Sequence, residues 1–114
     1  MTQITAHARV TLAYGGVEYA FDYPHPTDGD SAADVEAGMR FQWTEGNYGC
    51  DCNRIPFIET YCAVELEYPE GGLCGDTVSL VRLEAVYADG EVTQVYPDPH
   101  RVAERLAALG LTRY

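Results

Sequence analysis

The first part of the chain alternates between hydrophobic and polar residues with the period of a β-strand. In residues 3–13 one face carries the apolar side chains Ile4, Ala6, Ala8, Val10 and Leu12. Residues 17–23 repeat the alternation after Gly15-Gly16, a pair suited to the positive φ angles of a tight turn. We therefore predict a β-hairpin. A surface loop should follow at residues 24–31, where two prolines and a glycine oppose regular pairing.

The next segment carries a weak helix signal and then a further alternation. Ser31 and Asp34 favour a single short helical turn that ends at Gly38. In residues 39–44 one face then carries the apolar side chains Met39, Phe41 and Trp43. The period of two predicts a third strand there.

The decapeptide EGNYGCDCNR, residues 45–54, is the most unusual stretch of the chain. Its glycines, asparagines and aspartate are typical of a loop. An irregular apolar patch around Pro56 follows, and residues 61–68 resume the alternation, which predicts another strand.

Turn residues mark the last part of the predicted sheet. A turn-rich connection at residues 69–76 leads into residues 77–88, which are rich in β-branched side chains and predict a long strand. Asp89-Gly90 then favours a tight turn into a strand at residues 92–96. This pattern predicts a second hairpin.

The hydrophobic period changes at the C-terminus. Asp98 is a suitable N-cap, and Pro99 stands at the first helical position. After them, apolar residues recur at helical spacing at Val102, Leu106 and Leu109. We therefore expect one α+β domain over residues 1–114. An antiparallel sheet of about five or six strands should carry a C-terminal amphipathic helix packed on one face.

The net charge of the chain limits the kinds of partner that we expect it to bind. The 114 residues include 18 acidic and 7 basic ones, all of the latter arginine, so the net charge is −11. The arginines are scattered, which argues against direct nucleic-acid binding. The charge also opposes an anionic membrane and favours a basic protein partner, although it fits mere solubility as well. The chain has no apolar run of about 20 residues and no export signal, so we expect a cytoplasmic protein.

Four cysteines lie in the middle of the chain: Cys50, Cys52, Cys62 and Cys74. In a reducing cytosol, clustered thiols are more often metal ligands or free thiols than disulfides. Four thiolates fit one structural zinc ion, although the C-x-C spacing is less diagnostic than C-x-x-C. Three thiolates with a His or Asp, or reduced thiols without metal, are the alternatives. Export would instead favour a disulfide.

The decapeptide and its neighbours also carry candidate residues for binding a ligand or partner: Trp43, Glu45, Asn47, Tyr48, Asp51, Asn53 and Arg54. Arginine offers a planar fork for a carboxylate or phosphate, and aromatic rings offer a stacking face. The alternative is that these residues only build the loop, with Arg54 neutralising Asp51 or Glu45. No nucleophile elbow, phosphate loop or zinc-protease motif is present, which favours a protein that is not an enzyme.

The string WTEGNYGCDCNR at residues 43–54, with Cys74-Gly75-Asp76 after it, resembles a signature of small bacteriophage and prophage proteins. That signature reads W-x-E-G-N-x-x-C-D-C-N-R with a later C-G. The resemblance implies a phage gene expressed in the host cytoplasm, but no particular activity. It also favours Cys74 over Cys62 as partner of the C-x-C pair, with a His or Asp76 completing a metal site.

These observations together favour a small acidic phage-type protein that works by binding a basic protein, such as a host nucleic-acid-handling protein. Its cysteine-containing loop is expected to be held by zinc. The alternative is a small-molecule or nucleotide-binding protein, or a hydrolase, whose site contains Glu45, Asn47, Asp51 and Arg54. A minor virion component is a third hypothesis, because such proteins need no particular motif.

Overall fold

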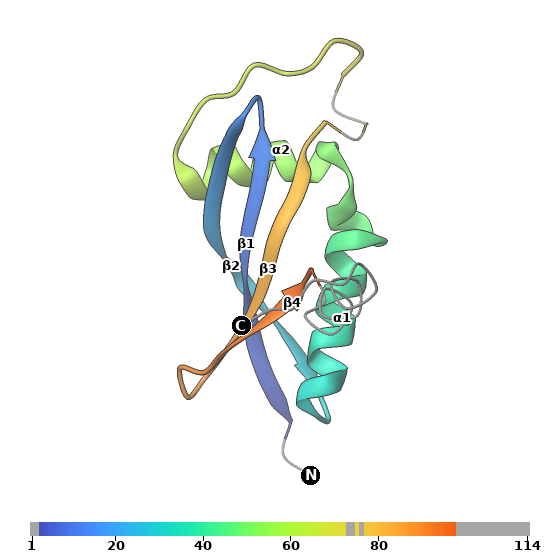
Figure 1. The fold of residues 1–114 in the computed structure, drawn as a ribbon, viewed down its shortest axis with the longest axis vertical. Coiled ribbons are helices and arrows are strands. Elements are labelled where there is room, and N and C mark those ends of the chain that lie inside the picture. Colours follow the sequence, from blue (N-terminus) through green and yellow to red (C-terminus); the bar gives the residue numbers. More distant parts are fainter. Residues whose placement is uncertain (1–2, 73–74, 76, 98–114) are drawn as a thin grey trace, which may run out of the picture.

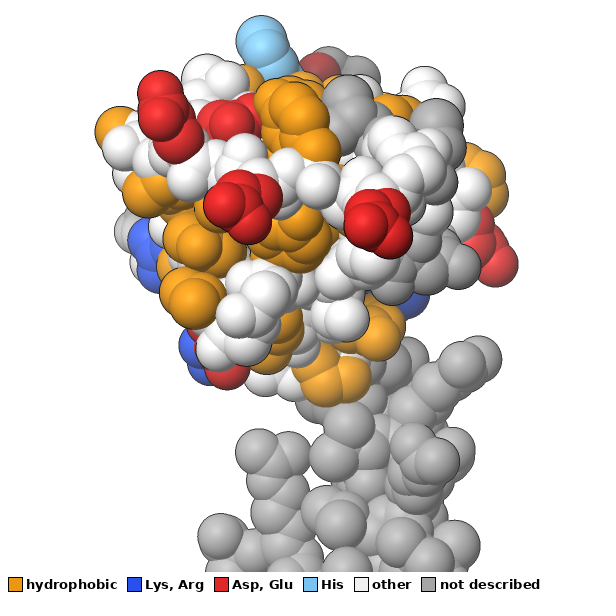
Figure 2. Space-filling view, turned by 90° about the horizontal axis from the view of Figure 1, so that it is seen from above, with side chains coloured by type: hydrophobic (Ala, Val, Ile, Leu, Met, Phe, Trp, Pro, Cys, Tyr) orange, Lys and Arg blue, Asp and Glu red, His pale blue; other side chains and the backbone are white. Residues whose placement is uncertain are grey.

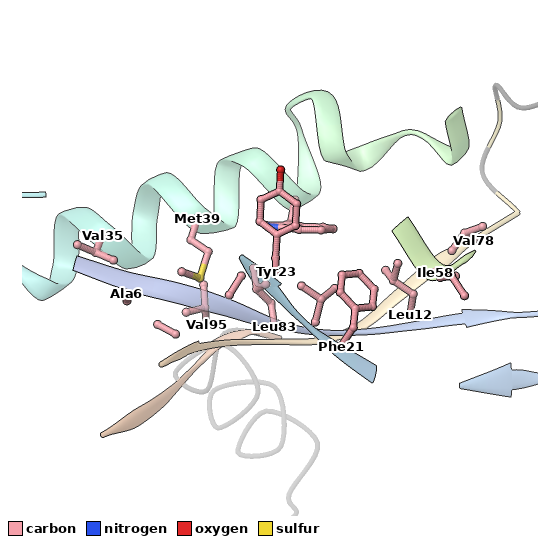
Figure 3. Packing of buried hydrophobic residues seen from close by; sticks show 14 of the residues in the cluster. Ala6, Leu12, Phe21, Tyr23, Val35, Met39, Ile58, Val78, Leu83 and Val95 are labelled. Atoms are coloured by element: carbon pink, nitrogen blue, oxygen red, sulfur yellow. The ribbon is translucent and has the colours of Figure 1, made fainter. Parts of the chain in front are cut away.

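The computed structural model describes residues 3–72, 75 and 77–97 (Figure 1). Its elements, in chain order, are β1 (Ile4–Tyr14), β2 (Val17–Gly29), α1 (Ala32–Thr44), the 3-10 helix η1 (Asn47–Gly49), α2 (Asp51–Cys62), β3 (Ser79–Tyr87) and β4 (Val92–Tyr96). The strands form one antiparallel sheet in the order β2-β1-β3-β4. Both α-helices lie on the same face of this sheet (Figure 3). The α+β class is therefore confirmed.

The predicted N-terminal hairpin is confirmed, but β2 is longer than the sequence indicated. The strand continues through residues 24–29, where the sequence predicts a loop. Pro24 and Pro26 are accommodated because β2 is an edge strand and because the pairing with β1 is irregular between Ala6 and Ala8. Edge strands and bulges are the places where a missing N–H breaks no ladder.

The predicted strand at residues 39–44 is wrong, and so is the end of the helical turn at Gly38. Residues Ala32–Thr44 form one helix, α1. The cap was predicted correctly, because Ser31 Oγ accepts a hydrogen bond from the Asp34 N–H at 3.2 Å. The helix buries the side chains Val35, Met39 and Trp43. These residues recur every four positions, whereas Phe41 between them is 59% exposed.

The decapeptide and the segment after it also differ from the prediction. Residues 45–54 contain η1 and the first turn of α2, and Pro56 lies inside that helix. The helix α2 replaces both the irregular patch and the start of the strand predicted at 61–68. It ends at Cys62, where Ala63 adopts the left-handed conformation with φ 55°. The chain from residue 64 to residue 68 belongs to no helix or strand.

The second hairpin is confirmed. β3 lies within the predicted range, and β4 has the predicted bounds. The turn is closed by hydrogen bonds from Gly90 N to Tyr87 O and from Tyr87 N to Glu91 O, both 2.9 Å.

The strand count and the placement of the helices differ from the predicted architecture. The described residues form a sheet of four strands, not five or six, and the helices that cover it lie between β2 and β3. The C-terminal helix predicted from Asp98 onwards lies outside the described residues. Within the described ranges, no helix combines the length and the apolar character that crossing a membrane requires.

The core lies between the sheet and the two helices (Figure 3). Its fully buried large side chains include Leu12, Met39, Trp43, Ile55, Ile58 and Leu83. Trp43 is packed among aromatic rings, with ring centroids 5.5 Å from Tyr23, 4.9 Å from Tyr48 and 5.7 Å from Phe57. The opposite face of the sheet is more polar, with Arg9 and Asp22 paired at 3.1 Å.

Candidate functional site

The decapeptide is a compact connection between α1 and α2. The N–H groups of Glu45 and Gly46 both donate to Phe41 O, at 2.8 and 2.7 Å, and end α1. Gly49 packs so closely that a Cβ placed there would lie 2.9 Å from Thr44 O. A side chain at position 49 would therefore displace the end of α1. This close approach explains why a glycine stands at this position.

Asp51 is fully buried and binds the segment that leads into β3. Its carboxylate accepts hydrogen bonds from Thr77 N at 2.9 Å, from the Thr77 hydroxyl and from Val78 N at 3.1 Å. A buried carboxylate requires such donors, because an unpaired charge in the interior is costly. Asp51 therefore joins the start of α2 to the chain just before β3.

Arg54 is 7% exposed and binds backbone carbonyls on three segments. Its guanidinium donates to Trp43 O at 2.6 Å, to Tyr48 O at 2.8 Å and to Val78 O at 2.7 Å. These contacts tie together the end of α1, η1 and the approach to β3. The planar fork of arginine is suited to several acceptors at once.

The structure therefore separates the seven predicted binding residues into two groups. Trp43, Asp51 and Arg54 are buried and support the fold. The other four, Glu45, Asn47, Tyr48 and Asn53, are exposed or half-buried. The small-molecule alternative required Asp51 and Arg54 to face a ligand, whereas both side chains bind the backbone. The hypothesis that these residues build the connection fits these contacts better.

Tyr48 contributes to an aromatic cluster beside β2. Its hydroxyl lies 2.7 Å from the Tyr23 hydroxyl, and the ring centroids are 5.2 Å apart. Burial, followed by this hydrogen bond, raises the pKa of Tyr23 well above its ordinary value. The cluster therefore favours the neutral form of Tyr23.

Two of the four cysteines are in contact. The Cys52 thiol donates to Cys50 Sγ at 2.9 Å, at the N-terminus of α2. Cys62 lies at the other end of that helix, about 15 Å away along its axis at 1.5 Å per residue. One metal ion cannot bind at both ends of α2, so Cys62 does not fit a site shared with Cys50 and Cys52.

Without Cys62, fewer residues remain as candidate zinc ligands. Cys74, which the resemblance favours, lies outside the described residues. Within the described ranges, no three His, Cys, Asp or Glu side chains gather as a metal site would need. Zinc on Cys50, Cys52 and Cys74 therefore stays a prediction.

An exposed surface that the sequence reasoning missed lies at one end of the molecule. We define the acidic end by Val17, Glu18, Glu59, Glu65, Glu67, Tyr68 and Glu70. The segment after α2 arches over the β1–β2 turn (Figure 1). Acidic and hydrophobic side chains stand side by side on this end, and basic ones lie only at its margins (Figure 2).

Hydrogen bonds hold residues 64–68, the part of the acidic end that belongs to no helix or strand, in place. Glu59 accepts from Leu66 N at 3.3 Å and from the Tyr68 hydroxyl at 2.8 Å, and the Tyr14 hydroxyl donates to Glu67 O. The alternation of glutamate with apolar residues was visible in the sequence. A period of two predicts a strand, and that prediction does not identify the exposed glutamates as one surface.

A cavity lies at the opposite end of the sheet from the acidic end. The cavity, of about 500 Å³, is lined by residues from β1, α1 and the β3–β4 turn, among them Glu36, Tyr87, Asp89 and Glu91. The Tyr87 hydroxyl donates to Glu36 Oε2 at 2.5 Å. Burial and this hydrogen bond raise the pKa of Tyr87. Glu36 is thus engaged within the protein.

Comparisons of the chain with protein-family models, with curated proteins and with solved structures found no match.

Proposed function

We propose that this protein is a small acidic binding protein, without enzymatic activity, that captures a protein partner through its acidic end. The observation that supports this proposal is that Glu65, Glu67 and Glu70 are exposed and flank the exposed Tyr68 along a segment held by hydrogen bonds. Charged groups give an interface its specificity and association rate, and aromatic side chains supply much of its binding energy.

The charge of this surface specifies the chemistry of the partner. Residues 55–81 contain no arginine, lysine or histidine, so no cation of that stretch offsets its glutamates. Tyr68 is 55% exposed and Val17 is 49% exposed, which adds apolar area to the negative surface. The partner that complements the acidic end is therefore a protein whose surface carries a basic patch with exposed apolar side chains. The nucleic-acid channel of a host nuclease or polymerase has this chemistry.

The fixed backbone of the segment favours binding. Because Glu59, Tyr14 and the end of α2 hold residues 64–68, less conformational entropy is lost when a partner binds than for a free loop. The network around Asp51 and Arg54 supports the same element from the other end of α2. The buried residues of the decapeptide thus position α2, and α2 positions the binding segment.

The experiment compares three immobilised proteins, each incubated with a bacterial lysate. A bacterial lysate is chosen because the sequence resembles phage proteins. They are the wild type, a Glu65→Gln/Glu67→Gln/Glu70→Gln variant and a control variant. The control, Asp28→Asn/Asp30→Asn/Asp34→Asn, removes the same charge from exposed positions at the opposite end of the molecule. Proteins retained at about 0.15 M salt are identified and quantified by mass spectrometry.

We expect a defined set of basic proteins to bind the wild type and the control but not the glutamine variant. Their affinity, measured with the purified partner, should fall about tenfold or more as salt rises from about 0.15 M to about 0.5 M. Equal capture by all three proteins would refute the acidic end as the binding surface. Capture that ignores salt would refute the electrostatic basis while leaving a binding function.

A further inference from the structure

Cys50 and Cys52 are placed as a reactive pair of thiols. Their Sγ atoms are 2.9 Å apart, and the Cys52 thiol donates its proton toward Cys50 Sγ. A disulfide bond measures about 2.05 Å and joins residues whose Cα atoms lie about 4.4–6.8 Å apart. Asp51 between them is helical, and helical geometry sets Cα atoms two residues apart at about 5.4 Å. The Cα spacing of the pair therefore lies within the range that a disulfide needs.

The surrounding contacts hold this pair in position. Asp51, the residue between the two cysteines, is anchored by Thr77 and Val78 through its buried carboxylate. The N–H groups of Asn53 and Arg54 donate to Cys50 O at 3.0 and 3.1 Å, which fixes the backbone on the other side. Both cysteines are half-buried rather than fully buried.

We propose that Cys50 and Cys52 form a redox-active dithiol that exchanges with low-molecular-weight disulfides of the glutathione class. Cys50 is the attacking residue, because its sulfur accepts the hydrogen bond and lies at the N-terminus of α2, where negative charge is favoured. Cys52 is the resolving residue. This activity is independent of the acidic end, which lies at the other end of the helix.

The exchange consists of two balanced steps. Cys50 Sγ, as thiolate, attacks one sulfur of the small disulfide, so that its S–S bond breaks, one small thiolate leaves and a mixed disulfide forms. The sulfur of Cys52 loses its proton to solvent, attacks Cys50 Sγ and displaces the second small thiolate. Overall, the protein dithiol gives up two electrons and two protons, and one small disulfide becomes two thiols.

Cys62 provides a matched control on the same helix. Its thiol donates to Ala20 O at 3.6 Å, and burial raises the pKa of the Cys62 thiol. A thiol held in its protonated form reacts slowly, because the thiolate is the nucleophile. Mixed-disulfide formation at Cys62 should therefore be at least about tenfold slower than at Cys50.

The experiment treats the full-length reduced protein with oxidised glutathione, blocks the remaining thiols by alkylation and maps the products by mass spectrometry. We expect the wild type to lose two of its four alkylatable thiols, with a disulfide mapped between Cys50 and Cys52. Cys52→Ser should accumulate a glutathione adduct at Cys50. Cys50→Ser should abolish fast exchange, and Cys62→Ser should react like the wild type.

Three results would overturn the proposal. One is a Cys52→Ser protein that traps no adduct while its circular dichroism remains that of the wild type. Another is an oxidised wild type in which Cys74 takes the place of either partner, which a Cys74→Ser variant would confirm by losing the disulfide. The third is a purified protein that holds one zinc ion per chain and exchanges only after the zinc has been chelated. The wild-type mapping needs no variant to fold.

Discussion

Asp51 and Arg54 bind the two sides of the same residue, Val78. Asp51 Oδ1 accepts from Val78 N at 3.1 Å, and Arg54 Nη1 donates to Val78 O at 2.7 Å. The acid and the base are three residues apart on α2, so they face the incoming chain together. Each charged side chain forms hydrogen bonds with backbone groups. The two residues together therefore fix the position at which the chain enters β3.

The first prediction concerns the geometry of Arg54. Arg54→Lys should lower the free energy of unfolding by about 2–4 kcal/mol, because one ammonium group cannot reach the three carbonyls that the guanidinium binds. Urea unfolding followed by circular dichroism measures the effect. Arg9→Lys is the control. The Arg9 side chain is exposed and pairs with Asp22, so this substitution should lower the free energy of unfolding by only about 0–1 kcal/mol. Equal losses would contradict the structural role of Arg54.

Local signals explain what the sequence predicted correctly. Both hairpins depend on alternation and on turn residues that stand next to each other, and the cap of α1 depends on Ser31 and Asp34, three positions apart. The contact of Cys50 with Cys52 is equally local, because their spacing brings them together at the start of a helix.

Longer-range contacts explain what the sequence could not predict. Met39, Phe41 and Trp43 have the spacing of a strand, but Val35, Met39 and Trp43 have that of a helix, and only burial against the sheet decides between them. The roles of Asp51 and Arg54 depend on Val78, which lies 27 and 24 positions away. No local pattern connects those residues.

The second prediction tests the helix at residues 39–44. Trp43→Ala should cost about 3–5 kcal/mol because Trp43 is fully buried in the core. Phe41→Ala should change stability by no more than about 0.5 kcal/mol because Phe41 faces solvent. Denaturant unfolding of both variants is the measurement. A strand would place both side chains on one face, so similar large losses would contradict α1.

The third prediction is a stabilising substitution at the end of α2. Ala63 adopts φ 55°, a conformation that strains any residue with a Cβ atom, so Ala63→Gly should raise stability by about 0.5–1 kcal/mol. Ala37→Gly is the matched control. It lies exposed inside α1 and should lower stability by about 1 kcal/mol. Thermal unfolding of the two variants should therefore show shifts of opposite sign, and a loss at both positions would contradict the left-handed cap.

The fourth prediction concerns alkaline pH. Burial and the hydrogen bond to Glu36 raise the pKa of Tyr87 above the ordinary value of 10.0. The folded protein therefore keeps a proton that the unfolded chain loses above about pH 10. This contribution to stability is fully present below pH 10 and falls as pH rises further, by about 1 kcal/mol at pH 11.

Substitution of Tyr87 separates this contribution from that of other alkaline groups. Tyr87→Phe should lose less stability than the wild type between pH 8 and pH 11, by about 1 kcal/mol, because it has no phenol to ionise. Urea unfolding at the two pH values is the measurement. Phe41→Leu changes an exposed residue without a titratable group and should reproduce the wild-type decrease. If Tyr87→Phe loses as much stability as the wild type, the hydrogen bond between Tyr87 and Glu36 does not hold the proton in solution.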